Sequence, residues 1–201
     1  LMSVKAILGL LSSFEDRYIP SFDDLALIVE DLKRMGYRIV LTQGVYDLLH
    51  LGHIKYLEAA KAAGDILVVG IDSDAWARSR KGPTRPIVPQ AERLNMLVSL
   101  RSVDLVTVIE GYGPGYRDLI EVIKPDVLII SETTSDISAE RMEFFRKNAG
   151  EVKKLPPQAT VSTTGRIRNL MVDGAVEHLR GLHKSLGETI VALEQGKGDE
   201  S

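Results

Sequence analysis

Hydrophobic residues are concentrated in four short runs, separated by longer segments with mixed polarity. The runs are residues 38–42, 66–71, 105–109 and 127–130, and a fifth strand candidate, residues 151–155, mixes Val and Leu with charged residues. The second and fourth are almost uninterrupted aliphatic stretches, which is typical of strands covered on both faces. Strand-like runs that alternate with helix-like segments indicate an α/β fold with a parallel sheet. The pattern therefore predicts a five-stranded parallel sheet.

The segments between these runs carry helix start and stop signals. Ser21 can cap a helix that continues to about Met35, where Gly36 ends it. Pro89 suits the first position of another helix, and Gly64 suits the end of a third. These two helices are expected over residues 89–101 and 52–63. Two further helices are expected over residues 116–123 and 138–150.

The C-terminal part shows an apolar stripe at steps of three and four residues. The stripe consists of Leu179, Leu182, Leu186, Ile190 and Leu193. This spacing predicts an amphipathic helix, which either packs on the chain's own sheet or pairs with a second copy. A homodimer is the favoured interpretation, with His178 and His183 at the surface or interface. The predicted organisation is an N-terminal segment (1–20), a domain (21–173) and a C-terminal helix with a frayed end (174–201).

Composition excludes several kinds of chemistry. The 201 residues include no cysteine, which excludes disulfides, zinc-thiolate sites and cysteine nucleophiles. A net charge of −3 gives no general attraction to nucleic acid or to an anionic membrane. No apolar stretch approaches the roughly 20 residues of a membrane span, and the run over residues 5–12 is short for a signal peptide. We expect a cytoplasmic protein without nucleic acid or membrane partners.

The segment between the first strand and the second helix carries His50-Leu51-Gly52-His53. Ligands of open α/β sheets bind beyond the carboxyl ends of the strands, where a helix N-terminus attracts anions. The two histidines are three positions apart, so their rings can face the same side. Gly52 allows a phosphate to approach the backbone. This arrangement suits a triphosphate and the charge that develops at its α-phosphorus during attack.

Two other interpretations of this segment remain open. The segment can be an ordinary helix start whose histidines are hydrogen-bonded to carbonyl groups. It can also be a metal site, although no third ligand of suitable type and spacing is present.

Residues 44–53, Gly-Val-Tyr-Asp-Leu-Leu-His-Leu-Gly-His, resemble the signature of the cytidylyltransferase-like nucleotidyltransferases. The similarity covers about residues 21–170 and is strongest to heptose 1-phosphate adenylyltransferases, with glycerol-3-phosphate cytidylyltransferases also similar. Class I aminoacyl-tRNA synthetases share the histidine turn but are longer. Beyond the signature, the similarity rests on Gly64-Asp65, Ile71–Asp74, Lys81–Pro86, Glu92-Arg93, Leu100–Asp104 and Ser162–Thr164.

The resemblance implies a fold and an activity. The fold is a Rossmann-like three-layer α/β/α domain, here with a C-terminal helical extension. The activity is transfer of a nucleoside monophosphate from ATP or CTP to a small phosphorylated sugar or polyol, with release of pyrophosphate. The implied cofactor is Mg²⁺, bound mainly through the nucleotide phosphates rather than by a protein metal site.

The resemblance also implies residue roles. His50, His53 and Lys81 form the catalytic set, with Lys81 in a loop after the second strand. The acceptor is expected to bind Asp47, Asp74 and Arg85, and Asp47 is also a candidate to help hold Mg²⁺. The residues expected to bind the nucleotide or its phosphates are Gly44, Val45, Tyr46, Gly52, Arg93, Ser162, Thr163 and Thr164.

Each of these roles has a structural alternative. Lys81 can be a solvated lysine, Arg93 a surface ion-pair partner and Asp47 a turn carboxylate. The hydroxyl groups of residues 162–164 can simply cap the following helix. Trp76 is interpreted as a core or interface residue rather than as a ligand contact.

The chain departs from the family pattern at two places. Residues 131–134 read Ser-Glu-Thr-Thr where relatives carry a Gly-Asp-aromatic turn. Residues 156–161 lack the Arg-Thr pair of the glycerol-phosphate enzymes, which argues against that specificity. Two alternative functions therefore stay open: a non-catalytic nucleotide-binding or regulatory module, and an α/β scaffold whose function lies in the C-terminal helix.

Overall fold

The computed structural model describes residues 13–113, 115–134, 137–158, 165, 172, 174–186 and 188. The chain divides into two units, Leu1–Thr160 and Val161–Ser201.

The first unit is built on a parallel sheet in which five strands are paired in the order β3-β2-β1-β4-β5. The strands are β1 (Ile39–Gly44), β2 (Ile66–Asp72), β3 (Leu105–Ile109), β4 (Val127–Ser131) and β5 (Glu151–Leu155). The strand order reverses between β1 and β4, and at such a point the chains leaving the carboxyl ends diverge to opposite faces and form a binding crevice. The predicted α/β fold class and its five parallel strands are confirmed.

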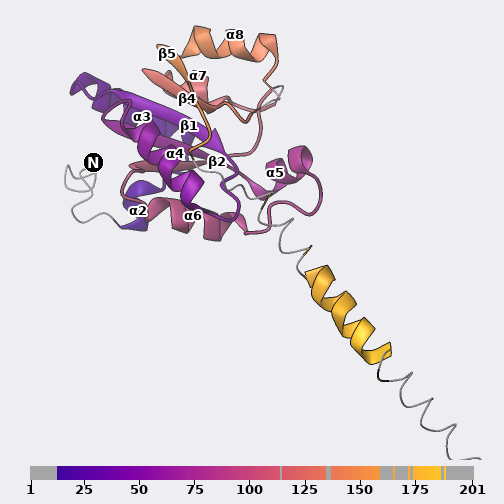
Figure 1. Cartoon of the computed structure of the whole chain (residues 1–201). Coiled ribbons are helices and arrows are strands. Elements are labelled where there is room, and N and C mark those ends of the chain that lie inside the picture. The colour runs from indigo at the N-terminus through magenta and orange to yellow at the C-terminus, as the bar shows by residue number, and fades with distance from the viewer. Residues whose placement is uncertain are drawn as a thin grey trace, which may run out of the picture. The chain divides into compact units, whose positions relative to one another are not determined.

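Helices cover both faces of this sheet (Figure 1). They are α2 (Phe14–Arg17), α3 (Phe22–Arg34), α4 (Leu51–Lys61), α5 (Asp74–Lys81), α6 (Gln90–Val98), α7 (Leu119–Ile123) and α8 (Ala139–Asn148). Residues of α3, α7 and α8 share one hydrophobic core, whereas residues of α4 and α6 share the other. Alternation along β1 feeds both cores, because Ile39 and Leu41 belong to the first and Val40 to the second.

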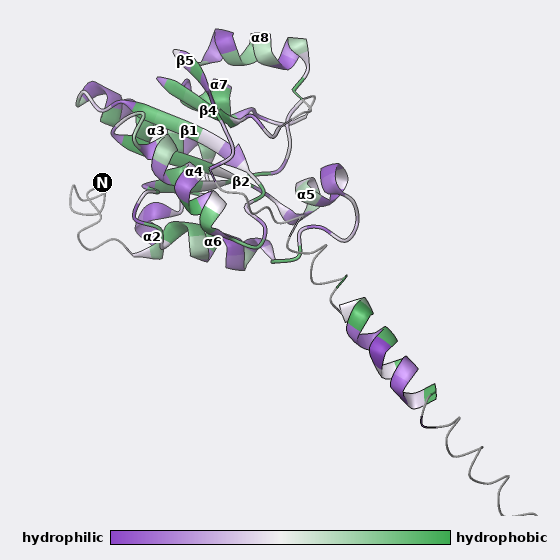
Figure 2. Cartoon of the chain, viewed as in Figure 1, coloured by the Kyte–Doolittle hydropathy of each residue, from purple (hydrophilic) through white to green (hydrophobic). Residues whose placement is uncertain are grey.

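Hydropathy along the chain explains this layering. In Figure 2 the strands carry mostly hydrophobic colour, while α5 and α8 carry much hydrophilic colour. Every residue of β2 is buried, as expected for a central parallel strand. By contrast, all five residues of β5, which forms one edge of the sheet, are at least partly exposed.

Serine side chains fix the starts of several helices. Ser21, Ser73 and Ser138 each accept a hydrogen bond from a backbone amide of the first turn, which satisfies one of the unpaired helix donors. The cap at Ser73 begins α5, and the cations in the last turn of this helix, including Lys81, complement the helix dipole. The prediction of a loop around Lys81 was therefore wrong, because Lys81 is the last residue of a helix.

The residues before α3 belong to the same core as the sheet. Tyr18 forms a parallel bridge with Val106, and the amide of Ile19 donates to the Val106 carbonyl at 2.9 Å. The side chain of Ile19 is buried with α3 and β1. The segment after α2 therefore lies along β3, while α2 itself contacts α6.

In the second unit, residues 174–186 are helical. The apolar residues of the predicted stripe that are described are exposed: Leu179 by 63%, Leu182 by 49% and Leu186 by 62%. Ile190, Leu193 and residues 162–164 lie outside the described residues. Among the residues that the structure describes, no helix has the length and apolar character needed to cross a bilayer.

Candidate active site

The turn between β1 and α4 has an unusual backbone. Tyr46 and Leu48 have φ values of 53° and 46°, in the left-handed region that side chains other than glycine rarely adopt. Such conformations cost on the order of 1–3 kcal/mol each and persist where surrounding contacts enforce them. The ring of Tyr46 is buried in the core formed with α4 and α6, which supplies such contacts. The turn therefore directs residues 47–50 across the end of β1.

His50 and His53 lie together at the start of α4. His50 is the N-cap residue, and its Nδ1 accepts a hydrogen bond from the Gly52 amide at 3.0 Å. Because Nδ1 is an acceptor, the proton of the neutral ring is on Nε2. The two imidazole rings are stacked, with centroids 3.9 Å apart and planes at 24°. The edge of Tyr46 meets His53 at a centroid distance of 5.6 Å.

His53 holds a buried nitrogen that has no hydrogen-bond partner among the residues that the structure describes. Its Nδ1 makes no hydrogen bond within the described part of the chain. Burial, followed by the neighbouring His50, lowers the pKa of His53 to about 4, and the attraction of Asp47 offsets only part of this. His53 is therefore neutral at pH 7 in the free protein. A buried polar atom without a partner is costly, so this nitrogen marks a place where a ligand would be stabilised.

Asp47 anchors a second loop to the histidine turn. Its carboxylate accepts hydrogen bonds from the amides of Ile87 at 3.0 Å and Val88 at 2.9 Å, and from the Arg85 guanidinium at 2.8 Å. Burial raises the pKa of Asp47, but the bonds from Val88, Ile87 and Arg85 outweigh it, and the net pKa is below its ordinary value. The acceptor contacts predicted for Asp47 and Arg85 remain predictions, and the structure pairs the two side chains with each other.

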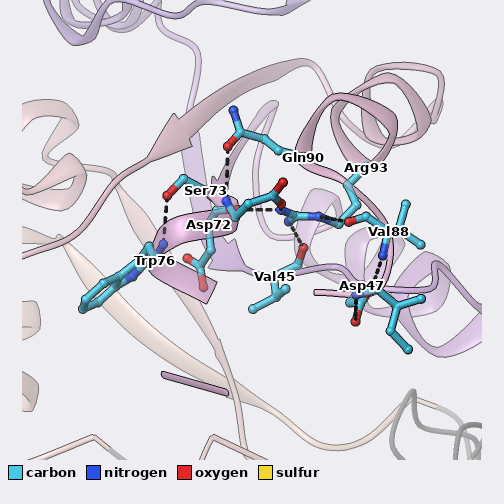
Figure 3. Close-up of polar contacts among 10 residues, drawn as sticks. Val45, Asp47, Asp72, Ser73, Trp76, Val88, Gln90 and Arg93 are labelled. Carbon is cyan, nitrogen blue, oxygen red and sulfur yellow. Dashed lines mark hydrogen bonds and ion pairs between the residues drawn. The ribbon is translucent and has the colours of Figure 1, made fainter. Parts of the chain in front are cut away.

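Arg93 lies at the centre of a network at the ends of β1 and β2 (Figure 3). Its side chain is 0% exposed. The guanidinium donates to the carbonyl groups of Val45, Asp72 and Val88 and to the carboxylate of Asp74. The phosphate contact predicted for Arg93 and the acceptor contact predicted for Asp74 stay predictions.

The structure adds residues that the sequence did not single out. Asp72, the last residue of β2, is 3% exposed and forms an ion pair with Arg80 of α5. Burial raises the pKa of Asp72, and Arg80 offsets only part of this rise. An aspartate that ends an aliphatic run was the available signal, because such a residue must lie at the ligand-binding edge of the sheet.

A cluster of aromatic and cationic side chains lies beyond the ends of β2 and β3. The rings of Trp76 and Tyr112 meet edge to face at 4.9 Å. The guanidinium of Arg141 lies 4.2 Å from the centre of the Tyr112 ring and pairs with Asp118. This cluster joins α5, α7 and α8. It depends on contacts between distant segments, so no local sequence pattern predicted it.

The other predicted site residues are less engaged or lie outside the described chain. Lys81 is exposed at the end of α5, next to Gly82 with φ of 96°. Gly44 and Val45 end β1 and begin the turn, and Gly52 lies in the first turn of α4. Ser162, Thr163 and Thr164 fall outside the described residues. Within the described residues, no group of three or more His, Asp or Glu side chains could hold a metal ion.

A Rossmann-like sheet with a histidine pair at the first strand-to-helix turn defines a nucleotide-binding α/β protein of the nucleotidyltransferase type. Comparison with known proteins is more specific, because the sequence model of the cytidylyltransferase-like family matches residues 41–169. The chain belongs to the cytidylyltransferase-like family, and the predicted family resemblance is confirmed.

Individual relatives agree with this assignment. The bifunctional protein HldE of Geotalea uraniireducens is 46% identical over 158 residues, which cover 77% of this chain and 31% of that protein. HldE of Sulfurimonas denitrificans is 37% identical over 165 residues, which cover 82% and 33%. The chain thus spans about a third of the length of these relatives.

A solved structure is similar as well. The lipopolysaccharide core biosynthesis protein from Thermoplasma volcanium superposes with a TM-score of 0.51 and 30% identity, covering 60% of this chain and 97% of that one. The similar region therefore includes nearly all of that protein.

Proposed function

We propose that this chain transfers a nucleoside monophosphate from ATP or CTP to a small phosphorylated sugar or polyol and releases pyrophosphate. The observation that carries the proposal is the stacked pair His50 and His53 at the N-terminus of α4. The buried Nδ1 of His53 has no partner in the described part of the chain. Family membership and the HldE relatives support the same reaction class.

In the proposed reaction, an oxygen of the acceptor's phosphate attacks the α-phosphorus of the nucleotide. A new P–O bond forms as the bond to the β-phosphate breaks, and pyrophosphate leaves in line with the attack. His50 presents its Nε2–H. His53, which is neutral in the free protein and carries one N–H donor, donates from both ring nitrogens once it takes up a proton beside the phosphates. These donors stabilise the negative charge that grows on the oxygens of the pentacoordinate transition state. No covalent enzyme intermediate is required.

Mg²⁺ is the proposed cofactor and would arrive on the phosphates. The carboxylates nearest to the turn fit poorly as metal ligands, because Asp47 is paired with Arg85 and two amides, and Asp72 with Arg80. When bound, Mg²⁺ neutralises phosphate charge and orients the leaving pyrophosphate. The exposed Lys81, at the end of α5, is proposed to reach the triphosphate and the acceptor phosphate.

The identity of the acceptor, the cellular location and the oligomeric state are also proposals. A sugar phosphate is favoured as acceptor by the HldE relatives and the lipopolysaccharide core biosynthesis protein. A cytoplasmic location fits a chain without cysteine. A homodimer is favoured by the apolar side chains of Leu179, Leu182 and Leu186, which are exposed on one helix.

The test is pyrophosphate release with Mg²⁺, run over a panel of sugar and polyol phosphates with ATP and CTP in parallel. We expect turnover with at least one pair, and loss of that turnover in a folded His53→Ala protein. Tight nucleotide binding without turnover across the panel would instead support the regulatory module.

One observation favours the non-catalytic regulatory module. In the turn after β4, the hydroxyl groups of Ser131 and Thr133 bond to each other at 2.7 Å, and the Glu132 amide donates to the Leu155 carbonyl. The amides of Glu132, Thr133 and Thr134 all donate to other groups of the protein, so they are not directed at a base or an acceptor.

A further inference from the structure

Val88 is held from both of its backbone groups. Its amide donates to the Asp47 carboxylate at 2.9 Å, and its carbonyl accepts from Nε of Arg93 at 2.9 Å. The preceding amide, that of Ile87, donates to the same carboxylate. We call this arrangement of Asp47, Val88 and Arg93 the Val88 clamp (Figure 3).

The clamp reaches every segment that carries a proposed catalytic group. The guanidinium of Arg93 also donates to the carbonyl of Val45, at the start of the histidine turn, and to the carbonyl of Asp72, at the end of β2. Its bond to the Asp74 carboxylate at 2.7 Å fixes the first residue of α5. The other end of α5 carries Lys81.

We propose that Arg93 and Asp47 are paired positioning residues, which hold residues 85–88 and α5 against the histidine turn and contact neither nucleotide nor acceptor. The catalytic consequences rest on the proposed function, whereas the structural role does not.

The hydrogen bonds that Arg93 donates support a positioning role for this residue. A guanidinium has five N–H groups, and Arg93 directs four hydrogen bonds to protein acceptors while being 0% exposed. A phosphate could reach the remaining N–H only if the chain that covers this buried guanidinium moved. The Asp47 carboxylate is 6% exposed and accepts from Arg85 and two amides, so it is similarly engaged.

Loss of the clamp should reduce turnover rather than substrate binding. A displacement of about 1 Å in a reacting geometry can cost about 100-fold in rate. We therefore expect Arg93→Lys and Asp47→Asn each to lower kcat about 10- to 100-fold at saturating nucleotide and acceptor. A direct acceptor ligand at Asp47 would instead raise the acceptor KM and leave kcat unchanged, which would overturn the proposal.

A double-mutant cycle separates a shared role from two independent roles. Since both side chains act through Val88, the double variant should be within about threefold of the slower single variant. Losses that multiply would mean that the two residues act independently, and the clamp would be rejected. Arg34→Lys on α3 is the matched control, because Arg34 is exposed and pairs only with residues of its own helix, Glu30 and Asp31, among the described interactions.

Amide hydrogen exchange tests the clamp without an activity assay. In the wild type, the amides of Ile87 and Val88 should exchange slowly. Arg93→Lys leaves their acceptor, Asp47, in place, yet should speed exchange of both amides about tenfold or more; unchanged exchange refutes the clamp. If Arg93→Lys does not fold, the same measurement on the isosteric Asp47→Asn, with its kcat, decides the question. A wild type without transferase activity would refute the proposed function and leave the exchange result valid.

Discussion

Two groups of buried polar residues lie at the carboxyl ends of β1 and β2, and they differ in how completely their hydrogen-bonding groups are paired. At the start of α4, the buried Nδ1 of His53 lacks a hydrogen-bond partner within the described chain. Around Arg93, a fully buried guanidinium is matched by four protein acceptors. A network in which most donors are paired gives a rigid frame, while a buried group without a partner keeps interaction energy available for a ligand. The contrast separates the groups proposed to act on substrate from the groups that hold them.

The largest effect on the rate is expected when His53 is replaced, because its buried Nδ1 has no partner within the described residues. His53→Asn should lower the rate of nucleotidyl transfer about 10²- to 10³-fold, the usual consequence of losing one preorganised donor. Steady-state pyrophosphate release measures this loss. His178→Asn is the matched control, because His178 is an exposed histidine of the C-terminal helix. Full activity in the His53 variant would contradict the proposed roles of the two regions.

The same histidine should make stability depend on pH. The folded-state pKa of about 4 lies below the ordinary value of 6.5, so the unfolded chain binds more protons between these values. Stability should therefore be fully present above pH 6.5 and fall as the pH drops toward 4, by up to about 3 kcal/mol for this group. Urea unfolding at several pH values measures the slope. His53→Asn should flatten it, and an unchanged slope would show that His53 is not the group responsible.

Replacement of Lys81 tests whether this exposed cation at the end of α5 binds the phosphates. Lys81→Met should reduce kcat/KM about 10- to 100-fold, because a charge-assisted bond to phosphate is lost. Lys147→Met on α8 provides the control, since Lys147 is another exposed lysine near a helix end. Equal activity of the two variants would assign Lys81 to the solvated surface.

The smallest effect is expected from the second unit. A chain that ends at residue 173 should keep nucleotide affinity and turnover within about twofold, because all the polar contacts described at the site involve residues of the first unit. The same truncation should abolish a homodimer if the exposed apolar stripe forms it. Sedimentation and pyrophosphate assays on the truncated chain measure both properties. A dimer that survives truncation would place the interface elsewhere.

Hydrophobic patterning was sufficient to predict the layers of this protein. All five strands were expected within one or two residues of their observed bounds. The four strands other than β5 are mostly aliphatic, and such runs are buried on both faces of a parallel sheet. The histidine turn was also predictable, because its residues are adjacent in sequence and a strand-to-helix turn places them together. A short helix was expected after Asp74, but its extension to Lys81 was missed, because the composition of α5 is strongly polar and gives no hydrophobic signal.

The sequence by itself therefore determined the sheet, the covering helices and the position of the histidine pair, because each depends on local spacing. Only the tertiary structure decided which charges are paired. In the sequence, Asp47, Asp74 and Arg93 are all candidate ligand contacts. In the structure, their hydrogen-bond partners come from segments up to 48 residues away. Whether a buried charge faces a ligand or another part of the chain depends on how those segments meet, since pairing and desolvation are set by three-dimensional proximity.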